Sequence, residues 1–299
     1  MTYTYRAYGL VIRVPFACPS LVPCVDEPDV TVREAAVPRR LDGAPMSDPS
    51  FDAAPGQFLF RGGAQGGRFL VQGGAVTLER NGQANDATLA RQFTDRILAA
   101  VLLHRGFLVL HADALVAPDG RAIVVAGESG AGKSTTLAAV LDQGATMLSD
   151  DVTVLGGDGE GRVQVLPGAA QLHLTKDAVE GLGYEIEPGQ LQPWRRMKAA
   201  IATHAGMAER PVRLAALYVL ETWPEEYVAT NMLAGRRKFE ALQACMYGPM
   251  FADEHLGVLP VMSALMDHVV FWRLYRPQRG WSVADVVTEI LGAARSPTP

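Results

Sequence analysis

The sequence predicts a mixed α/β fold, and three observations point to it. Short strand-like runs separated by Gly and Pro fill residues 1–100, helical periodicity alternates with apolar runs in residues 101–299, and a glycine-rich loop joins a strand to a helix near the middle. We therefore expect a small β-rich N-terminal domain over residues 1–100 and an α/β (α+β) domain with a mixed sheet over residues 101–299. With 48% hydrophobic and 20% charged residues, the chain can bury a sizeable core.

The N-terminal domain is expected to consist of short strands, because β-branched and aromatic runs there are bounded by Gly, Pro and Asp. The segment from Pro38 to Pro55 is predicted to be a surface loop. From Ala87 to His104 apolar residues recur every three or four positions, which predicts an amphipathic helix near the domain boundary. The predicted strands are Tyr8–Val14, Asp29–Arg33, Gln57–Arg61, Arg68–Gln72 and Ala75–Leu78.

The middle of the chain combines a hairpin with a strand–loop–helix unit. A Pro-Asp-Gly turn between two apolar runs indicates the hairpin, and Gly144 is suited to end the helix because glycine tolerates left-handed backbone. The predicted elements are strand Leu108–Val116, turn Pro118–Gly120, strand Ala122–Ala126, helix Lys133–Leu141 and strand Ala145–Leu148.

The C-terminal third mixes buried strands with amphipathic helices, on the same periodicity arguments. The predicted strands are Ala215–Glu221 and Val269–Leu274, and the predicted helices are Ala234–Met246, Pro260–Asp267 and Val283–Ala294.

The most informative pattern is the run from Gly127 to Ser134, which satisfies the phosphate-loop consensus G-x-x-x-x-G-K-[ST]. Glycines let successive backbone N–H groups curl around a phosphate, and the following helix directs its partial positive charge at the anion. We expect Lys133 to face solvent and neutralise the β- and γ-phosphates, with the Ser134 hydroxyl on Mg²⁺. A glycine turn without function is the alternative, but the flanking strand and helix favour a site for ATP and Mg²⁺. The predicted nucleotide-binding residues are Gly127, Glu128, Ser129, Gly130, Ala131, Gly132, Lys133, Ser134 and Thr135.

Two adjacent carboxylates, Asp150 and Asp151, follow the next predicted strand. Carboxylates near a phosphate loop can bind Mg²⁺ or accept the proton of an attacking hydroxyl. A polar turn between two strands explains the same pair, and the pattern leaves both readings open. His111 lies on the preceding strand, with Asp113 on the same face, and a histidine there is often only structural.

These motifs together resemble the catalytic domain of the HPr kinase/phosphorylase family. The resemblance rests on His111–Val116, the phosphate loop, and Leu148–Val152 with its Asp pair. In that family the Asp pair serves Mg²⁺ binding and proton removal from a serine hydroxyl, with the histidine close by. The resemblance implies catalytic roles for Asp150, Asp151, His111 and Lys133, with Ser134 and Asp150 as metal ligands and Asp151 as base, although the two Asp roles could be exchanged.

The chain departs from the HPr kinase pattern after Val154. The Ile-Arg-Gly-Leu-Gly signature is absent and Val165–Leu174 stands in its region, which speaks against HPr recognition and phosphorylase activity. The plan is more similar to divergent HPr kinase-like proteins of bacterial biosynthetic clusters, including kinases that phosphorylate the C-terminal serine of lasso peptide precursors. Tyr5–Gly9, Pro167-Gly168 and Leu172–Leu174 carry that resemblance.

Several further basic and imidazole side chains are candidates for the site. Arg195, Arg196 and Lys198 follow a Pro-Trp turn, and a cation there could reach the transferred phosphoryl group; a solvated turn is the alternative. We select Lys198, because related kinases often carry a lysine in this stretch. Arg273 and Arg276 are interpreted as structural. The histidines left unassigned, because they lack metal-ligand spacing, are His173, His204, His255 and His268.

We expect an ATP- and Mg²⁺-dependent kinase that acts on a serine hydroxyl of a peptide or protein, docked partly by an unpaired strand edge of the N-terminal domain. One alternative is a kinase of free serine or a similar metabolite. Another is a regulatory module that senses ATP without transferring phosphate. The resemblance also allows a homo-oligomer, since HPr kinases are oligomers.

Composition excludes some other classes of protein. The net charge of −5 gives no basic face for nucleic acid, and no apolar run is long enough to span a membrane. The N-terminus lacks the features of a signal peptide. Three cysteines, Cys18, Cys24 and Cys245, form neither a disulfide framework nor a zinc motif, so we expect a cytoplasmic location.

Overall fold

The structure is a computed structural model that describes residues 1–186, 191–192, 198–202, 206–247 and 257–293. It divides into two compact units, one of Met1–Val109 with Tyr247–Leu259 and one of Leu110–Met246 with Pro260–Pro299. The predicted boundary after residue 100 falls inside helix α2 (Leu98–His104), whereas the structural boundary falls after Val109. The mixed α/β class with a β-rich N-terminal part is confirmed.

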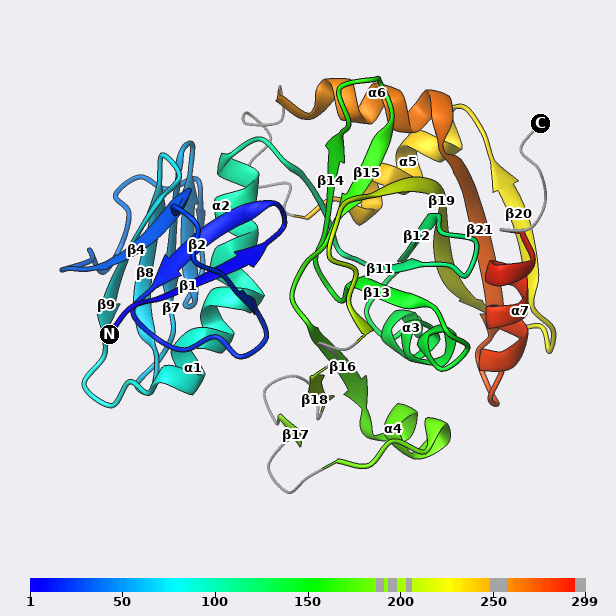
Figure 1. The fold of residues 1–299 in the computed structure, drawn as a ribbon, viewed down its shortest axis with the longest axis horizontal. Coiled ribbons are helices and arrows are strands. Elements are labelled where there is room, and N and C mark those ends of the chain that lie inside the picture. Colours follow the sequence, from blue (N-terminus) through cyan, green and yellow to red (C-terminus); the bar gives the residue numbers. More distant parts are fainter. Residues whose placement is uncertain (187–190, 193–197, 203–205, 248–256, 294–299) are drawn as a thin grey trace. The chain divides into compact units, whose positions relative to one another are not determined.

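The first unit, drawn in blue to cyan in Figure 1, contains one sheet. Its strand order is β3-β1-β2-β4-β9-β8-β7-β6-β5. Adjacent strands are antiparallel except for the β2–β4 and β4–β9 pairs, which are parallel. Its strands are β1 (Tyr3–Ala7), β2 (Leu10–Val14), β3 (Val22–Pro23), β4 (Val30–Glu34), β5 (Met46–Ser47), β6 (Phe51–Ala54), β7 (Gln57–Arg61), β8 (Gly67–Gln72) and β9 (Ala75–Arg80).

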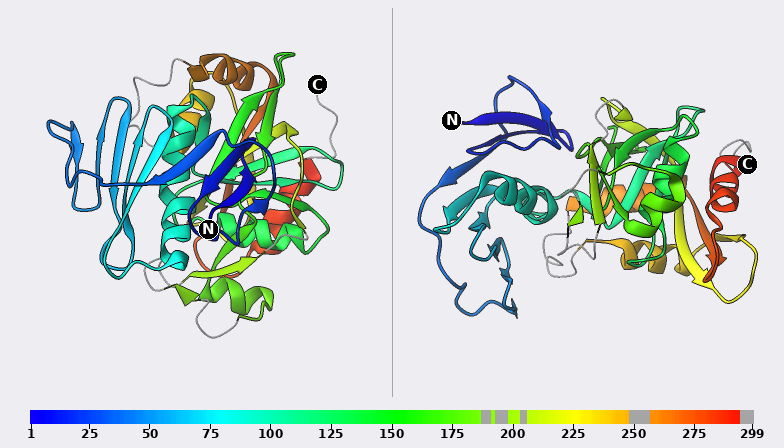
Figure 2. Two further views of the ribbon diagram at one scale, coloured as in Figure 1. Left: turned by 60° about the vertical axis from the view of Figure 1, so that its left-hand side comes forward. Right: turned by 90° about the horizontal axis from the view of Figure 1, so that it is seen from below.

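The predicted helix of the first unit is one continuous run in the structure. It consists of α1 (Asp86–Gln92), a π-helical turn (Phe93–Ile97) and α2, and it lies along the sheet (Figure 2). Asn85 caps its start by accepting a hydrogen bond from the Thr88 N–H. The apolar positions that predicted the helix are its buried face, and Phe93 meets Phe16 edge-on.

The predicted loop from Pro38 to Pro55 contains β5 and β6, so that prediction is wrong over these strands. A buried carboxylate organises them. Asp52 is 1% exposed and accepts hydrogen bonds from the Arg61 guanidinium, the Ser47 hydroxyl and the Leu41 N–H. These partners lie 5, 9 and 11 residues from Asp52, and the hydrophobic periodicity of the sequence does not mark such side-chain pairing.

The second unit contains a mixed sheet in which β12, β19 and β21 run parallel. Strand β11 pairs antiparallel with β12 and β13, as the hairpin prediction required, and β14 pairs with β15. The start of β19 pairs with β15, and β20 pairs with β21. The strands are β11 (Ala112–Val116), β12 (Ala122–Ala126), β13 (Thr146–Ser149), β14 (Thr153–Gly157), β15 (Val163–Leu166), β19 (Val212–Trp223), β20 (Ala229–Leu233) and β21 (Val270–Pro277).

The predicted strand Leu108–Val116 is two strands, β10 (Leu108–Leu110) and β11, separated at His111. The His111 N–H donates to the Cys245 carbonyl oxygen at 2.7 Å, so the backbone changes hydrogen-bond partners at this residue. This break sets His111 apart from the regular ladder that follows.

A smaller three-stranded sheet in the second unit has the order β16-β18-β17. Helix α4 follows directly after strand β16 in the chain. Helices α3, α5, α6 and α7 agree with the predicted helices to within two residues at each end, whereas α4 was not predicted. These elements are β16 (Gln171–Thr175), β17 (Leu191–Gln192), β18 (Lys198–Ala202), α3 (Lys133–Leu141), α4 (Lys176–Leu182), α5 (Arg236–Cys245), α6 (Leu259–His268) and α7 (Val283–Ala293).

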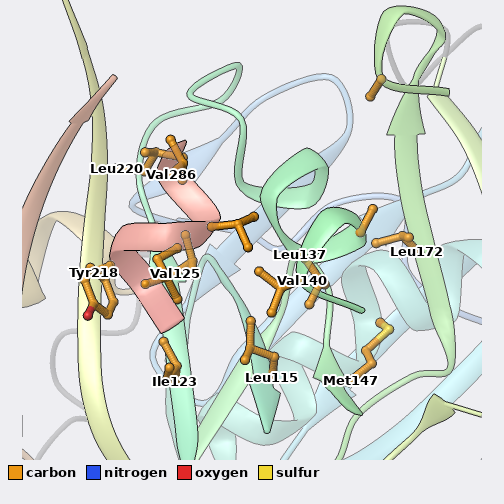
Figure 3. Packing of buried hydrophobic residues seen from close by; sticks show 14 of the residues in the cluster. Leu115, Ile123, Val125, Leu137, Val140, Met147, Leu172, Tyr218, Leu220 and Val286 are labelled. Carbon is orange, nitrogen blue, oxygen red and sulfur yellow. The ribbon is translucent and has the colours of Figure 1, made fainter. Parts of the chain in front are cut away.

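The core of the second unit joins both sheets through α3. Leu137 and Val140 of α3 pack among Val125, Leu172 and Val286, which come from β12, β16 and α7 (Figure 3). Helix α3 is therefore held on several sides, and the loop before it starts from a fixed scaffold. Within the part of the chain that the structure describes, no helix has the length and apolar character to cross a bilayer.

Candidate functional site

The glycine-rich loop begins where β12 ends, at the edge of the sheet where the parallel strands β19 and β21 also finish. Ligands of α/β sheets commonly bind outside the carboxyl ends of parallel strands. Gly127 has φ +145°, and a Cβ there would lie 2.4 Å from the Leu220 carbonyl oxygen. Gly132 starts α3 with φ +106°. Both positions therefore require glycine, for close approach and for left-handed backbone.

The Lys133 ammonium lies inside the loop. Its Nζ donates to the carbonyl oxygens of Gly127 at 2.9 Å and Glu128 at 3.4 Å, and lies 3.3 Å from His111 Nε2. Lys133 is only 7% exposed, so the expectation that it faces solvent is wrong. Two carbonyl oxygens of the loop itself therefore hold the ammonium.

These contacts determine the tautomer of His111. An ammonium has only hydrogens to offer, so Nε2 of His111 accepts and its proton is assigned to Nδ1. Nδ1 lies 3.2 Å from the Asp151 carbonyl oxygen and 3.4 Å from Asp151 Oδ1. Burial and the charge of Lys133 lower the pKa of His111, which keeps the imidazole neutral near pH 7. His111 therefore presents an N–H to Asp151.

Asp151 sits in an unusual backbone conformation. Its φ is +69°, and the Val152 N–H donates to the Asp150 carbonyl oxygen at 2.8 Å, which closes a three-residue turn around Asp151. Non-glycine residues in this region are uncommon and cluster at functional sites. Asp113 Oδ1 accepts from the Asp151 N–H at 2.9 Å and so supports the turn.

Asp150 is held in a chain of hydrogen bonds. Its Oδ1 accepts from the Ser134 hydroxyl at 2.8 Å. Its Oδ2 accepts from the His173 backbone N–H at 2.7 Å and pairs with His173 Nδ1 at 2.8 Å. The sequence analysis left His173 unassigned, and the structure places it directly behind the carboxylate that contacts the phosphate loop.

Asp113 and Asp150 form a buried carboxyl pair of unequal charge. Burial and the charge of Asp150 raise the pKa of Asp113 well above its usual value. Burial acts the same way on Asp150, but the hydrogen bond with His173 and the charges of His173 and Lys198 outweigh it and lower the pKa of Asp150. Of the two, Asp150 is therefore the carboxylate that ionises more readily. Asp113 Oδ2 finds no hydrogen-bond partner among the described residues.

The donor set near Ser134 fits Mg²⁺. Mg²⁺ prefers oxygen ligands and is usually held by one or two carboxylates together with substrate phosphates and water. The Ser134 hydroxyl and an ionised Asp150 supply hard oxygen donors beside the phosphate loop.

A pocket of about 630 Å³ lies in the second unit, and His111, Lys133, Ser134 and Asp151 line it. Lys198 lines it, and its charge lowers the pKa of both Asp150 and His111. Arg195 and Arg196 lie outside the described residues. Of the predicted site residues, those that line the pocket are His111, Ser129, Gly130, Gly132, Lys133, Ser134, Thr135, Asp151 and Lys198.

Arg276, which the sequence analysis interpreted as structural, also lines the pocket. Its Nε donates to the Ala131 carbonyl oxygen at 2.5 Å and another guanidinium nitrogen donates to the Gly130 carbonyl oxygen at 3.2 Å. Burial lowers the pKa of Arg276, although not enough to remove its charge at neutral pH. It braces the loop and adds positive charge beside it.

We expect His173→Ala to raise the Mg²⁺ concentration needed for nucleotide binding by about tenfold or more, because outer partners of metal ligands typically contribute that much. His173→Asn should show a smaller rise in the Mg²⁺ requirement than His173→Ala, since the asparagine amide N–H can donate to Asp150. The measurement is a Mg²⁺ titration of nucleotide affinity at constant pH. Equal Mg²⁺ dependence in all three proteins would show that His173 serves only the fold.

Comparisons with known proteins add little to this geometry. No family model matches the sequence, and no curated protein matches it either. Among solved structures, the HPr(Ser) kinase/phosphatase from Coxiella burnetii aligns with 62% of this chain and 93% of its own, at 14% identity and a TM-score of 0.30.

Proposed function

We propose that this protein is an ATP- and Mg²⁺-dependent kinase that transfers the γ-phosphoryl group to a serine hydroxyl of a peptide or protein. The observation that carries the proposal is the convergence of Lys133, Ser134, Asp151 and His111 on one pocket at the end of β12, with Asp150 bonded to Ser134. A phosphate loop, a cation, a metal-binding pair and a second carboxylate are the parts that phosphoryl transfer requires.

Positively charged groups would bind the phosphates, and oxygen ligands would bind Mg²⁺. The loop amides and Lys133 would hold the β- and γ-phosphates once the ammonium exchanges its carbonyl partners for phosphate oxygens. Arg276 and Lys198 add cationic character around the same pocket. Ser134 and Asp150 would hold Mg²⁺, which when bound neutralises charge on the phosphate oxygens. Preorganised charge of this kind is the main contribution of such sites to catalysis.

The geometry favours Asp151 over Asp150 as the base. Both oxygens of Asp150 accept hydrogen bonds from Ser134 or His173, and Asp150 is buried. Asp151 lines the pocket with a side chain that is 28% exposed. The serine proton would pass to the Asp151 carboxylate while the serine oxygen bonds to the γ-phosphorus. The bond from that phosphorus to the bridging oxygen then breaks and ADP leaves.

Two acceptors are compatible with the proposed chemistry. A serine at the C-terminus of a lasso peptide precursor fits the sequence resemblance, and free serine is the competing acceptor. The two edge strands of the N-terminal sheet, β3 and β5, have two residues each, and Pro23 in β3 has no N–H to donate. These edges offer little backbone for pairing with an extended peptide, so edge docking on that sheet is not part of the proposal.

The test is transfer of labelled γ-phosphate from ATP to a serine-terminated peptide, to free serine, and to no acceptor, with and without Mg²⁺. We expect Mg²⁺-dependent labelling of the peptide. Labelling of free serine alone would make the protein a metabolite kinase. Tight ATP binding with no transfer to any acceptor would make it a nucleotide sensor.

A further inference from the structure

Trp281 is an exposed aromatic side chain in the wall of the nucleotide pocket. It lies between β21 and α7, lines the same pocket as Lys133, and is 53% exposed. A tryptophan loses favourable burial when half of it faces water, so a half-exposed indole in a concave site suggests a ligand surface.

The indole of Trp281 packs closely against Gly181. At Gly181, in α4, an ideal Cβ would lie 2.4 Å from Trp281 Cη2 and 2.8 Å from Cζ2 and Cζ3. Any larger residue at position 181 would displace the ring edge. One edge of the ring therefore rests on the backbone of α4, which limits how much conformational freedom the ring loses when a ligand stacks on it.

Apolar side chains line the pocket beside its polar groups, and the charged Lys176 and Asp177 line it as well. Ala178, Val283 and Val286 line it from α4 and α7, and Thr175 and Ser282 add hydroxyl groups. Arg276 ties the strand before Trp281 to the loop through the carbonyls of Gly130 and Ala131. Phosphate-binding groups and an aromatic surface thus belong to one built pocket.

We propose that Trp281 stacks on the purine base of the nucleoside triphosphate whose phosphates occupy the glycine-rich loop. This inference rests on the proposed function, because it takes the phosphate site as given and assigns the base. Stacking on an aromatic face discriminates poorly among bases, since every base has such a face. ATP and GTP are therefore expected to bind with affinities within a few-fold of each other.

The test separates the base from the phosphates in the full-length protein. Affinities for a non-hydrolysable ATP analogue and for inorganic tripolyphosphate are measured with Mg²⁺ by calorimetry, in wild type, Trp281→Ala, Trp281→Phe and Tyr227→Ala. Tyr227 is a matched control because its ring is 60% exposed outside the pocket. We expect Trp281→Ala to weaken the binding of the ATP analogue by about tenfold or more and to leave the affinity for tripolyphosphate unchanged. The affinity of Trp281→Phe for the ATP analogue should lie between those of wild type and Trp281→Ala.

Each other outcome has a defined meaning. Equal weakening of both ligands in Trp281→Ala would make the indole a structural support for the pocket and overturn the inference. Unchanged affinity for both would also overturn it, because the ring would not contact the base. A wild-type protein that binds tripolyphosphate as well as the ATP analogue would defeat base stacking and leave the phosphate site standing. If wild type binds neither ligand, the proposed function itself fails.

Discussion

Lys133→Ala is expected to lower the rate of phosphoryl transfer by about 10³-fold or more. Lys133 is the ammonium at the centre of the loop, and no other described lysine donates to the loop carbonyls. Without it, negative charge that develops on the transferred group loses its nearest neutralising partner. The measurement is kcat for the acceptor that proves active, with ATP at saturation.

The stability of the Lys133→Ala variant needs its own measurement, because Lys133 is buried. The carbonyl oxygens of Gly127 and Glu128 lose a donor, which should cost about 1–3 kcal/mol in the free energy of unfolding unless water replaces it. Arg236→Ala is the control, since it removes a cation that is 90% exposed and outside the pocket. Full turnover by a folded Lys133→Ala protein would defeat the proposed function.

Asp151→Asn is expected to lower kcat by about 10²–10⁴-fold while nucleotide affinity stays the same, because general-base catalysis contributes that much. Asparagine tolerates positive φ as aspartate does, so the turn at φ +69° should persist. Asp150→Asn should instead raise the Mg²⁺ requirement, because the ligand loses its charge. Both are measured as kcat and nucleotide affinity over a Mg²⁺ series.

Asp119→Asn serves as the control for both variants. Asp119 lies in the exposed hairpin turn, and an asparagine there can still accept from the Arg121 N–H. If the two effects appear on the opposite residues, the roles of Asp150 and Asp151 are exchanged. Normal kinetics in both variants would mean that the pair is only a turn between strands.

Much of the site was within reach of the sequence because its signals are local. The glycines at positions 127 and 132, the lysine and the hydroxyl lie within eight residues, and α3 starts and ends where the periodicity indicated. Asp150 and Asp151 could be placed after β13, but not distinguished, because their roles depend on the partner of each carboxylate.

The other partners of the site come from distant parts of the chain. His173 meets Asp150 across 23 residues, Asp113 meets Asp151 across 38, and Arg276 meets Ala131 across 145. None of these residues has a distinguishing local pattern: His173 lies in an ordinary β16 alternation, and Arg276 ends an apolar strand. Such contacts form only when β16 packs on α3 and β21 pairs parallel with β19.

What the sequence determined by itself is the glycine-rich loop between β12 and α3 with its lysine, since glycine backbone freedom and the start of a helix are local properties. What only the tertiary structure decided is the hydrogen-bond partners and the electrostatic surroundings of each group around the loop. The lowered pKa of Asp150, the raised pKa of Asp113 and the tautomer of His111 all depend on burial and on groups brought from other elements. A pKa responds to distance and desolvation, and neither quantity exists until the chain has folded.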